Sequence, residues 1–360
     1  MQDNAMSRWL SPLMAFCLSF IIIATLAPLV GIQAERQLDF WLLWLGTMLV
    51  LALPITYLEV ALAKRSKTTA LHALSSLTRD ADASPQWRLV GWLAVIFMPF
   101  LAGGMLFNAS RMLGQWALPS LSTHLTFLAL AAVAVAVSFL PRAITVLLTI
   151  VGVIAALVSS VVLGEQLPTW QVTALEFSEW GAATVLALVA SGLGLGVYSQ
   201  VSLNAVKQHE RATTTVLPVW IAQLLAVVAF GFFIANTQIP AAALVLSVIT
   251  GSGLLLSLAR EQLQQRQTPV LIQWAAVLVA LLIWAIPMLN PIFNVLVLIW
   301  GLVICLVYAL FAGWMMKISH LRKSLNFGHE AVYNLWRIAV RIVLPLSIVL
   351  AIVALVGKLI

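Results

Sequence analysis

The sequence predicts an all-α protein that crosses a membrane many times, and three observations lead to this fold class. Of the 360 residues, 62% are hydrophobic and only 9% are charged, whereas a soluble globular domain has roughly 25% charged residues. The apolar residues form runs close to the roughly 20 residues that a membrane-spanning helix needs. None of these runs alternates in polarity over about 10 residues, as the strands of a membrane barrel do.

Eleven apolar runs are long enough to be transmembrane helices. They are 8–31, 39–63, 89–117, 122–140, 143–164, 181–203, 212–235, 239–259, 268–287, 290–316 and 338–358. The chain starts MQDNAMSRWLSP and has no small-residue cleavage site after the first run. We therefore interpret that run as a span and not as a removed signal peptide.

Basic residues predict the orientation, because cytoplasmic loops carry an excess of Lys and Arg. With a cytoplasmic N-terminus, the outer side receives only Arg36, Arg111 and Lys358 of the 19 basic residues. The outer loop 165–180 is acidic instead, with three glutamates. The C-terminus is then expected outside the cell or in the periplasm.

Several function classes are disfavoured by the same composition. The net charge of +7 does not indicate nucleic-acid binding, because the basic residues lie in short loops without interleaved aromatic residues. Cys17 and Cys305 lie inside apolar spans and are expected to be small core residues. No Ser/His/Asp set or metal-ligand set falls at one depth, so we expect no enzyme activity, no metal and no cofactor.

Glu59 is the main carboxylate at membrane depth, and ionisable residues there are functional candidates by default. The alternative is a carboxylate near the helix end that bonds to the backbone or to Lys64. All five histidines lie in loops or at span ends, which does not indicate a proton path.

The stretch SGLGLGVYSQ, residues 191–200, interrupts an apolar span with three glycines. Each glycine costs a helix about 1 kcal/mol relative to alanine. Small residues allow close helix packing, but these glycines are spaced two residues apart and do not share one face. The spacing therefore favours a helix that unwinds between Ser191 and Gly196, with freed backbone groups facing a solute site.

These motifs together resemble the neurotransmitter:sodium symporter family. The glycine run is similar to its broken sixth helix, and residues 40–66 to its second helix, with Pro54 and Glu59 at matching positions. Further stretches follow in the family's order over nearly the full chain. They are VGWLAVIFMPF (90–100, third helix), 141–168 (fifth helix and outer loop) and 311–350 (Gly-Trp signature, basic loop and last helix with Pro345).

The resemblance implies a divergent bacterial member in the inner membrane, with two inverted repeats of five helices and one peripheral helix. The first repeat would be 1–164 and the second 181–316, separated by the external loop 165–180. Residues 317–360 would form a cytoplasmic loop and the last helix. A solute would bind at mid-membrane, where helices one and six unwind.

The first helix departs from the family. FCLSFIIIATLAP (16–28) lacks the glycines and asparagines whose carbonyl and amide oxygens bind sodium in the family. Isoleucines 21–23 offer no side-chain oxygen, and Leu26 replaces the outer-gate arginine. In the eighth helix Ser247 and Thr250 are kept, but Gly251 replaces the next serine. We therefore expect that the usual sodium site is lost.

The resemblance nominates residues of helices one, three, six and eight for the solute site. They are Ser19, Phe20, Met105, Asn108, Gly192, Gly194, Tyr198, Ser199 and Thr250. Three of them have a structural alternative: Asn108 as one interhelical hydrogen bond, Tyr198 as packing, and Thr250 as a donor to the carbonyl of its own preceding turn.

Two functions follow from these features. The first is a secondary transporter of a small organic solute, amino-acid-like by the resemblance, and the retained glycine run favours it. The second is a degenerate, non-transporting protein that serves as scaffold, sensor or assembly partner through its basic faces 64–88 and 317–341. The lost ion motif favours the second. The expected partners are the lipid bilayer and a small-molecule solute, without nucleic acid, and a protein partner is left open.

Overall fold

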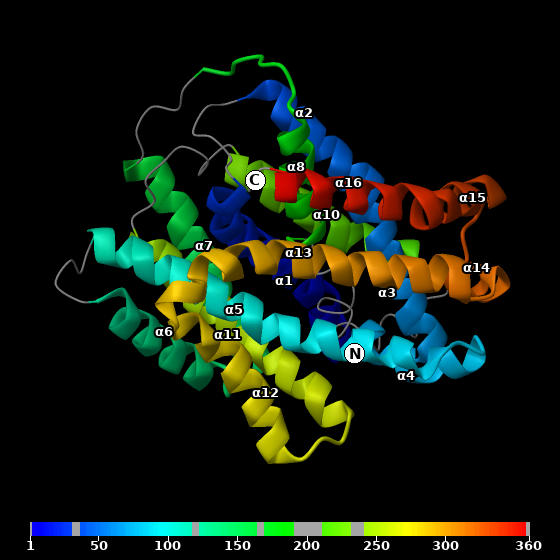
Figure 1. The fold of residues 1–360 in the computed structure, drawn as a ribbon, viewed down its shortest axis with the longest axis horizontal. Helices are drawn as coiled ribbons and strands as arrows, with labels where there is room; N and C mark the ends of the chain where they lie inside the picture. Colours follow the sequence, from blue (N-terminus) through cyan, green and yellow to red (C-terminus); the bar gives the residue numbers. More distant parts are fainter. Residues whose placement is uncertain are drawn as a thin grey trace.

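The computed structural model describes residues 2–30, 37–116, 122–163, 169–190, 211–231 and 241–357. These residues form a helical bundle without a β-sheet (Figure 1). Over these ranges the single β-bridge joins Gln37 to Gln171. The all-α fold class that the sequence predicts is confirmed.

The long continuous helices are α1 (Gln2–Val30), α5 (Arg88–Trp116), α7 (Arg142–Leu163), α11 (Ala241–Gln265) and α13 (Asn290–Leu310). Two further rods contain π-helical turns: α2 (Leu38–Thr47), η1 (Met48–Ala52) and α3 (Leu53–Ser66), and α15 (Glu330–Ile338), η8 (Ala339–Val343) and α16 (Leu344–Gly357). A third π-helical turn, η7 (Phe311–Met315), ends α13.

The shorter helices are α4 (Ala70–Asp80), α6 (Thr123–Val137), α8 (Phe177–Leu188), α10 (Thr213–Ala229), α12 (Val270–Leu282) and α14 (Ile318–Leu325). Single 3-10 turns are η2 (Pro85–Trp87), η5 (Ile283–Ala285) and η6 (Pro287–Leu289).

Each of the eleven predicted spans contains helix in its described part. By length and composition, seven described helical rods can cross a membrane. They are Trp9–Val30, Leu38–Ser66, Pro85–Gly114, Arg142–Val162, Leu244–Gln265, Pro287–Met315 and Glu330–Gly357. The apolar helices Thr123–Val137, Thr213–Ala229 and Val270–Ala285 are shorter. Several crossings are therefore supported, whereas the number eleven and the inverted repeat stay predictions.

Helix α1 lies at the centre of the bundle and packs against α5, α7, α8, α10 and α11 (Figure 1). From Met14 to Ala27 its apolar residues are buried, apart from the half-buried Phe16. A helix that is apolar on every side is stable either inside a bundle or against lipid, and the burial of α1 shows that other helices surround it. α1 is also continuous through residues 16–23, the counterpart of the segment that breaks in the resembled family.

Two segments predicted as connections are helical in part. α4 lies within 64–88, and α14 and the start of α15 lie within 317–337. In α4 the leucines 71, 74 and 77 recur every three residues and are all buried. This amphipathic spacing stabilises a short helix at the end of a bundle, although the segment is too polar to form a span.

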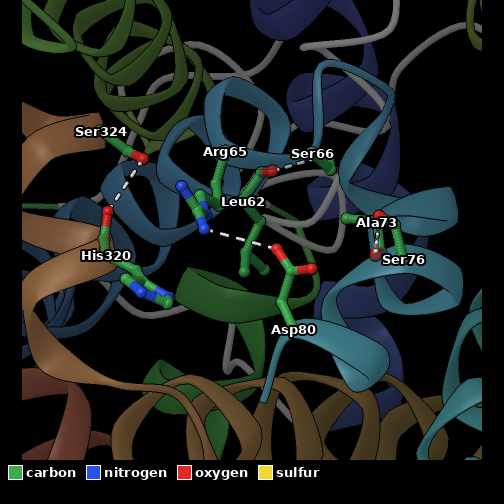
Figure 2. Close-up of polar contacts among 8 residues, drawn as sticks. All are labelled: Leu62, Arg65, Ser66, Ala73, Ser76, Asp80, His320 and Ser324. Carbon is green, nitrogen blue, oxygen red and sulfur yellow. Dashed lines mark hydrogen bonds and ion pairs between the residues drawn. The ribbon is translucent and has the colours of Figure 1, made fainter. Parts of the chain in front are cut away.

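Connections predicted on the cytoplasmic side meet at one end of the bundle, where α4 and α14 lie (Figure 1). The N–H of Ala212 donates to Leu325 O at 3.1 Å, and the Thr69 hydroxyl lies 2.9 Å from Gln262 Oε1. The ion pair between Arg65 at the end of α3 and Asp80 of α4, at 3.4 Å, lies at this end as well (Figure 2). These contacts agree with one shared side, and its assignment to the cytoplasm stays a prediction.

Connections predicted on the outer side meet one another as well. The N–H of Leu38 donates to Gln171 O at 2.8 Å, and Thr173 donates to the carboxylate of Asp39 from both its backbone N–H and its hydroxyl. This joins the start of α2 to the segment before α8.

Candidate functional site

The glycine run lies outside the described residues. Its members Gly192, Gly194, Tyr198 and Ser199 therefore stay predictions, and so does the unwinding between Ser191 and Gly196. Helix α8 leads into the run, and residues 181–190 before it are all buried. The described part of the candidate site consists of α1, α5 and α11, which pack against one another.

The approach of α11 to α1 is close at Gly251. A β-carbon at Gly251 would lie 2.8 Å from Ile21 Cδ1 and 3.6 Å from Leu18 Cδ2. A serine at 251, as in the resembled family, would collide with Ile21 unless that side chain moved. The side chain of Ile21 therefore occupies the space that the missing side chain of Gly251 leaves between α1 and α11.

Ser19 and Phe20 of α1 lie within this packed region. They are 1% and 0% exposed, and the ring of Phe20 stacks on Phe16 with 6.3 Å between centroids. The full burial of Phe20 shows that it is packed among other side chains. Ser19 already has an interaction partner. Both residues lie between Leu18 and Ile21, the two residues of α1 that approach Gly251 of α11, and their place in the solute site stays a prediction.

The two hydroxyl groups of α11 that the sequence relates to ion or solute binding both bond within their own helix. Ser247 Oγ donates to Leu244 O at 2.7 Å, and Thr250 Oγ1 lies 3.0 Å from Leu246 O and 3.1 Å from Ser247 O. This is the structural alternative that the sequence raises for Thr250. The hydroxyl hydrogen is used in α11, so Thr250 can serve a ligand only as an acceptor.

Helix α5 contributes Met105 and Asn108. Met105 is 1% exposed, and Asn108 is half-buried. The amide nitrogen of Asn108 is buried, and it has no hydrogen-bond partner among the described residues. A buried donor left unpaired costs about 1–3 kcal/mol. Among the candidates in α1, α5 and α11, Asn108 thus has a donor available to a ligand.

Sequence reasoning missed the residue that holds α5 in place. Trp284 of η5 is fully buried against two glycines of α5: a β-carbon at Gly103 would lie 2.5 Å from Trp284 Cδ1, and one at Gly104 would lie 2.8 Å from Cζ2. Its indole N–H donates to Phe100 O at 2.9 Å. The Gly103–Gly104 pair in an apolar helix could have indicated this contact, since small residues permit another element to approach the helix closely.

The two cysteines and Glu59 are buried in the protein. Cys17 and Cys305 are core residues, as the sequence predicts. Glu59 is 2% exposed and has an interaction partner. Within the described ranges, no three His, Cys, Asp or Glu side chains are grouped in a way that could hold a metal ion.

Comparison with solved structures identifies the fold. The crystal structure of MhsT in complex with L-phenylalanine matches with a TM-score of 0.53 over 96% of this chain and 98% of that chain, at 13% sequence identity. MhsT is a transporter of the neurotransmitter:sodium symporter family. No family model and no curated protein sequence matches this chain. The protein therefore has the same fold as MhsT, and at this identity the likeness shows the fold alone.

Proposed function

We propose that this protein is a secondary transporter of a small, amino-acid-like organic solute in a bacterial inner membrane, with a cytoplasmic N-terminus. The observation that carries the proposal is the fold match over nearly all of both chains to MhsT, which was solved with L-phenylalanine bound. The buried amide nitrogen of Asn108 in α5, which has no hydrogen-bond partner among the described residues, supports it.

In this proposal, apolar and polar side chains of α1, α5 and α11 hold the two ends of the solute. Phe20, Ile21 and Met105 are buried and apolar, so they favour an apolar portion of the solute through burial of apolar surface. Hydrogen bonds would come from Asn108 as donor and from the Thr250 hydroxyl as acceptor. We therefore expect a solute with an apolar side chain and a compact polar end.

The test of this function is uptake by the purified protein in liposomes. We expect saturable uptake of at least one labelled apolar amino acid, beginning with L-phenylalanine, above the level in empty liposomes. The non-transporting alternative is favoured by the continuous helix α1. It would be supported if the folded, correctly inserted protein neither bound nor moved any amino acid in the panel.

Replacing Asn108 with leucine separates a binding role from a structural one. We expect Asn108→Leu to leave thermal stability unchanged or higher, because it removes a buried unpaired donor. Solute affinity should fall about tenfold, which corresponds to one lost hydrogen bond of about 1.4 kcal/mol. Melting curves and equilibrium binding measure the two effects.

The matched control is Asn334→Leu, since Asn334 is exposed on α15, and it should change neither quantity. A marked fall in the melting temperature of Asn108→Leu with unchanged solute affinity would assign Asn108 to helix packing instead.

We further propose that the protein lacks the family's sodium site. Carbonyl groups of a continuous α1 are used within the helix, and Ile21–Ile23 supply no oxygen. A ligand at 100 times its dissociation constant stabilises a protein by roughly 2.7 kcal/mol. We expect no such difference between sodium and choline chloride at equal ionic strength. A sodium-specific rise in melting temperature that Thr250→Val abolishes would refute this.

A further inference from the structure

A basic surface lies where the last connection meets the final rod, at the junction of η7, α14, α15 and η8. Between residues 317 and 341 the sequence has five basic residues and one acidic residue, Glu330. Tyr333, Arg337 and Arg341 follow one another at four-residue intervals on one rod and therefore share a face, and Arg322 of α14 lies over the Tyr333 ring, 5.9 Å from Cζ to the ring centroid. They come from two segments but converge on one place.

One of these arginines is held rigidly. The guanidinium of Arg341 stacks on Trp314 of η7, with 4.7 Å from Cζ to the ring centroid. The Trp314 indole N–H donates to the carbonyl oxygen of Arg341 at 3.2 Å. That oxygen is available because Pro345, four residues later, has no N–H to donate to it.

The two π-helical turns lie against each other at the same point. A β-carbon at Gly313 of η7 would lie 3.0 Å from Arg341 Cγ and 3.3 Å from its Cα. Residues of η7 therefore pack against both the backbone and the side chain of Arg341, and this packing fixes the position of its positive charge. Ordering that is already complete in the free protein reduces the entropy cost of binding an anion.

The positive charge at this junction is only partly neutralised. Glu330 pairs with Arg322 at 3.2 Å, and both side chains are more than half exposed. In the described part of the chain, no carboxylate lies within ion-pair distance of Arg337 or Arg341. Two arginine side chains therefore remain for an external anion.

The apolar surroundings indicate the source of that anion. Leu335, Ile338 and Ile342 are 70%, 51% and 56% exposed, and they alternate along the rod with Arg337 and Arg341. Exposed apolar side chains on a rod able to cross a membrane face lipid chains, and Trp314, which is 57% exposed, is typical of the membrane interface. We therefore expect the arginines at the level where lipid headgroups meet the hydrocarbon.

We propose that Arg337, Arg341 and Trp314 form a binding site for the phosphate headgroup of an anionic phospholipid. Arginine presents paired N–H groups that match the oxygens of a phosphate, and basic pockets beside membrane helices bind such headgroups. The acyl chains of the same lipid would run along Leu335, Ile338 and Ile342. This site is separate from the solute site between α1, α5 and α11.

The experiment uses the full-length protein, purified in detergent and stripped of lipid. Phosphatidylglycerol or phosphatidylcholine is titrated in, and bound lipid is counted by native mass spectrometry. We expect preferential retention of phosphatidylglycerol. Arg337→Gln should weaken this retention roughly fivefold, the effect expected for removing one basic residue near the surface, and Arg337→Gln with Arg341→Gln should weaken it about 25-fold.

Two controls keep the result specific. Arg79→Gln removes an exposed arginine of α4 at the same end of the bundle and should leave retention unchanged. Arg337→Gln alone retains the stack of Arg341 on Trp314, so it remains informative if the double variant does not fold. Equal retention of both lipids, or equal losses for Arg79→Gln and Arg337→Gln, would overturn the proposal. Full competition by inorganic phosphate at matched concentration would also overturn it, because a soluble anion would then be the ligand.

Discussion

The substitution Trp284→Ala is expected to be strongly destabilising. Trp284 is fully buried and fills the space left by Gly103 and Gly104 in α5. Its ring also contacts Phe100 and Phe293, with centroid distances of 5.2 and 5.4 Å. Removal of a buried tryptophan side chain costs about 3–5 kcal/mol, because neighbouring residues collapse only partly into the cavity.

The hydrogen bond adds to this loss. Without the indole, Phe100 O loses the donor that Trp284 supplies. We expect Trp284→Phe to cost less than Trp284→Ala, since it keeps an aromatic ring and loses mainly the hydrogen bond, worth about 1 kcal/mol. Thermal unfolding of the detergent-solubilised protein measures both variants.

Trp9→Ala is the control, since Trp9 is 73% exposed and its removal leaves no internal cavity. If Trp284→Ala lowered the melting temperature no more than Trp9→Ala, the close packing of η5 on α5 would be wrong. If Trp284→Ala does lower the melting temperature, Asn108, one turn beyond Gly104, should also lose its fixed position. Solute affinity should then fall together with stability.

The course of the main helices could be predicted because long apolar runs have few alternatives in a membrane. Helix is present in all eleven predicted ranges. Helices α4 and α14 were not predicted, since their signal is a short amphipathic pattern and not a long apolar run. The leucines at 71, 74 and 77 carried that pattern in the sequence.

Among the candidate site residues, the sequence predicted a side-chain contact only where local chemistry decides it. The hydroxyl of Thr250 donates to a carbonyl of its own helix. A serine or threonine in mid-helix commonly forms this bond, and it is the alternative to a binding role that the sequence raises. The fit of Gly251 against Ile21 could not be derived, because it depends on how two helices more than 200 residues apart face each other. The contact of Trp284 with Gly103 is of the same kind.

The second large effect concerns the approach of α7 to α11. A β-carbon at Gly152 would lie 2.8 Å from both the Cα and the backbone nitrogen of Ser247. A side chain in the way can rotate, but backbone atoms cannot, so any larger residue at 152 must push the two helices apart. Overpacking of this kind typically costs 1–3 kcal/mol. We expect at least that for Gly152→Ala and more for Gly152→Leu, with little monodisperse protein recovered.

Gly46 provides the matched control for this substitution. It also lies within a helix, α2, but a β-carbon there would meet nothing within 4 Å. Gly46→Leu should therefore be neutral or stabilising by about 0.5–1 kcal/mol, because glycine weakens a helix interior. Similar melting temperatures for Gly152→Leu and Gly46→Leu would show that α7 and α11 are not in contact at Ser247. A large difference between these melting temperatures would mean that α7 fixes the position of the turn of α11 that carries Ser247 and Thr250. Gly152→Ala should then weaken solute binding, although residue 152 does not contact the solute.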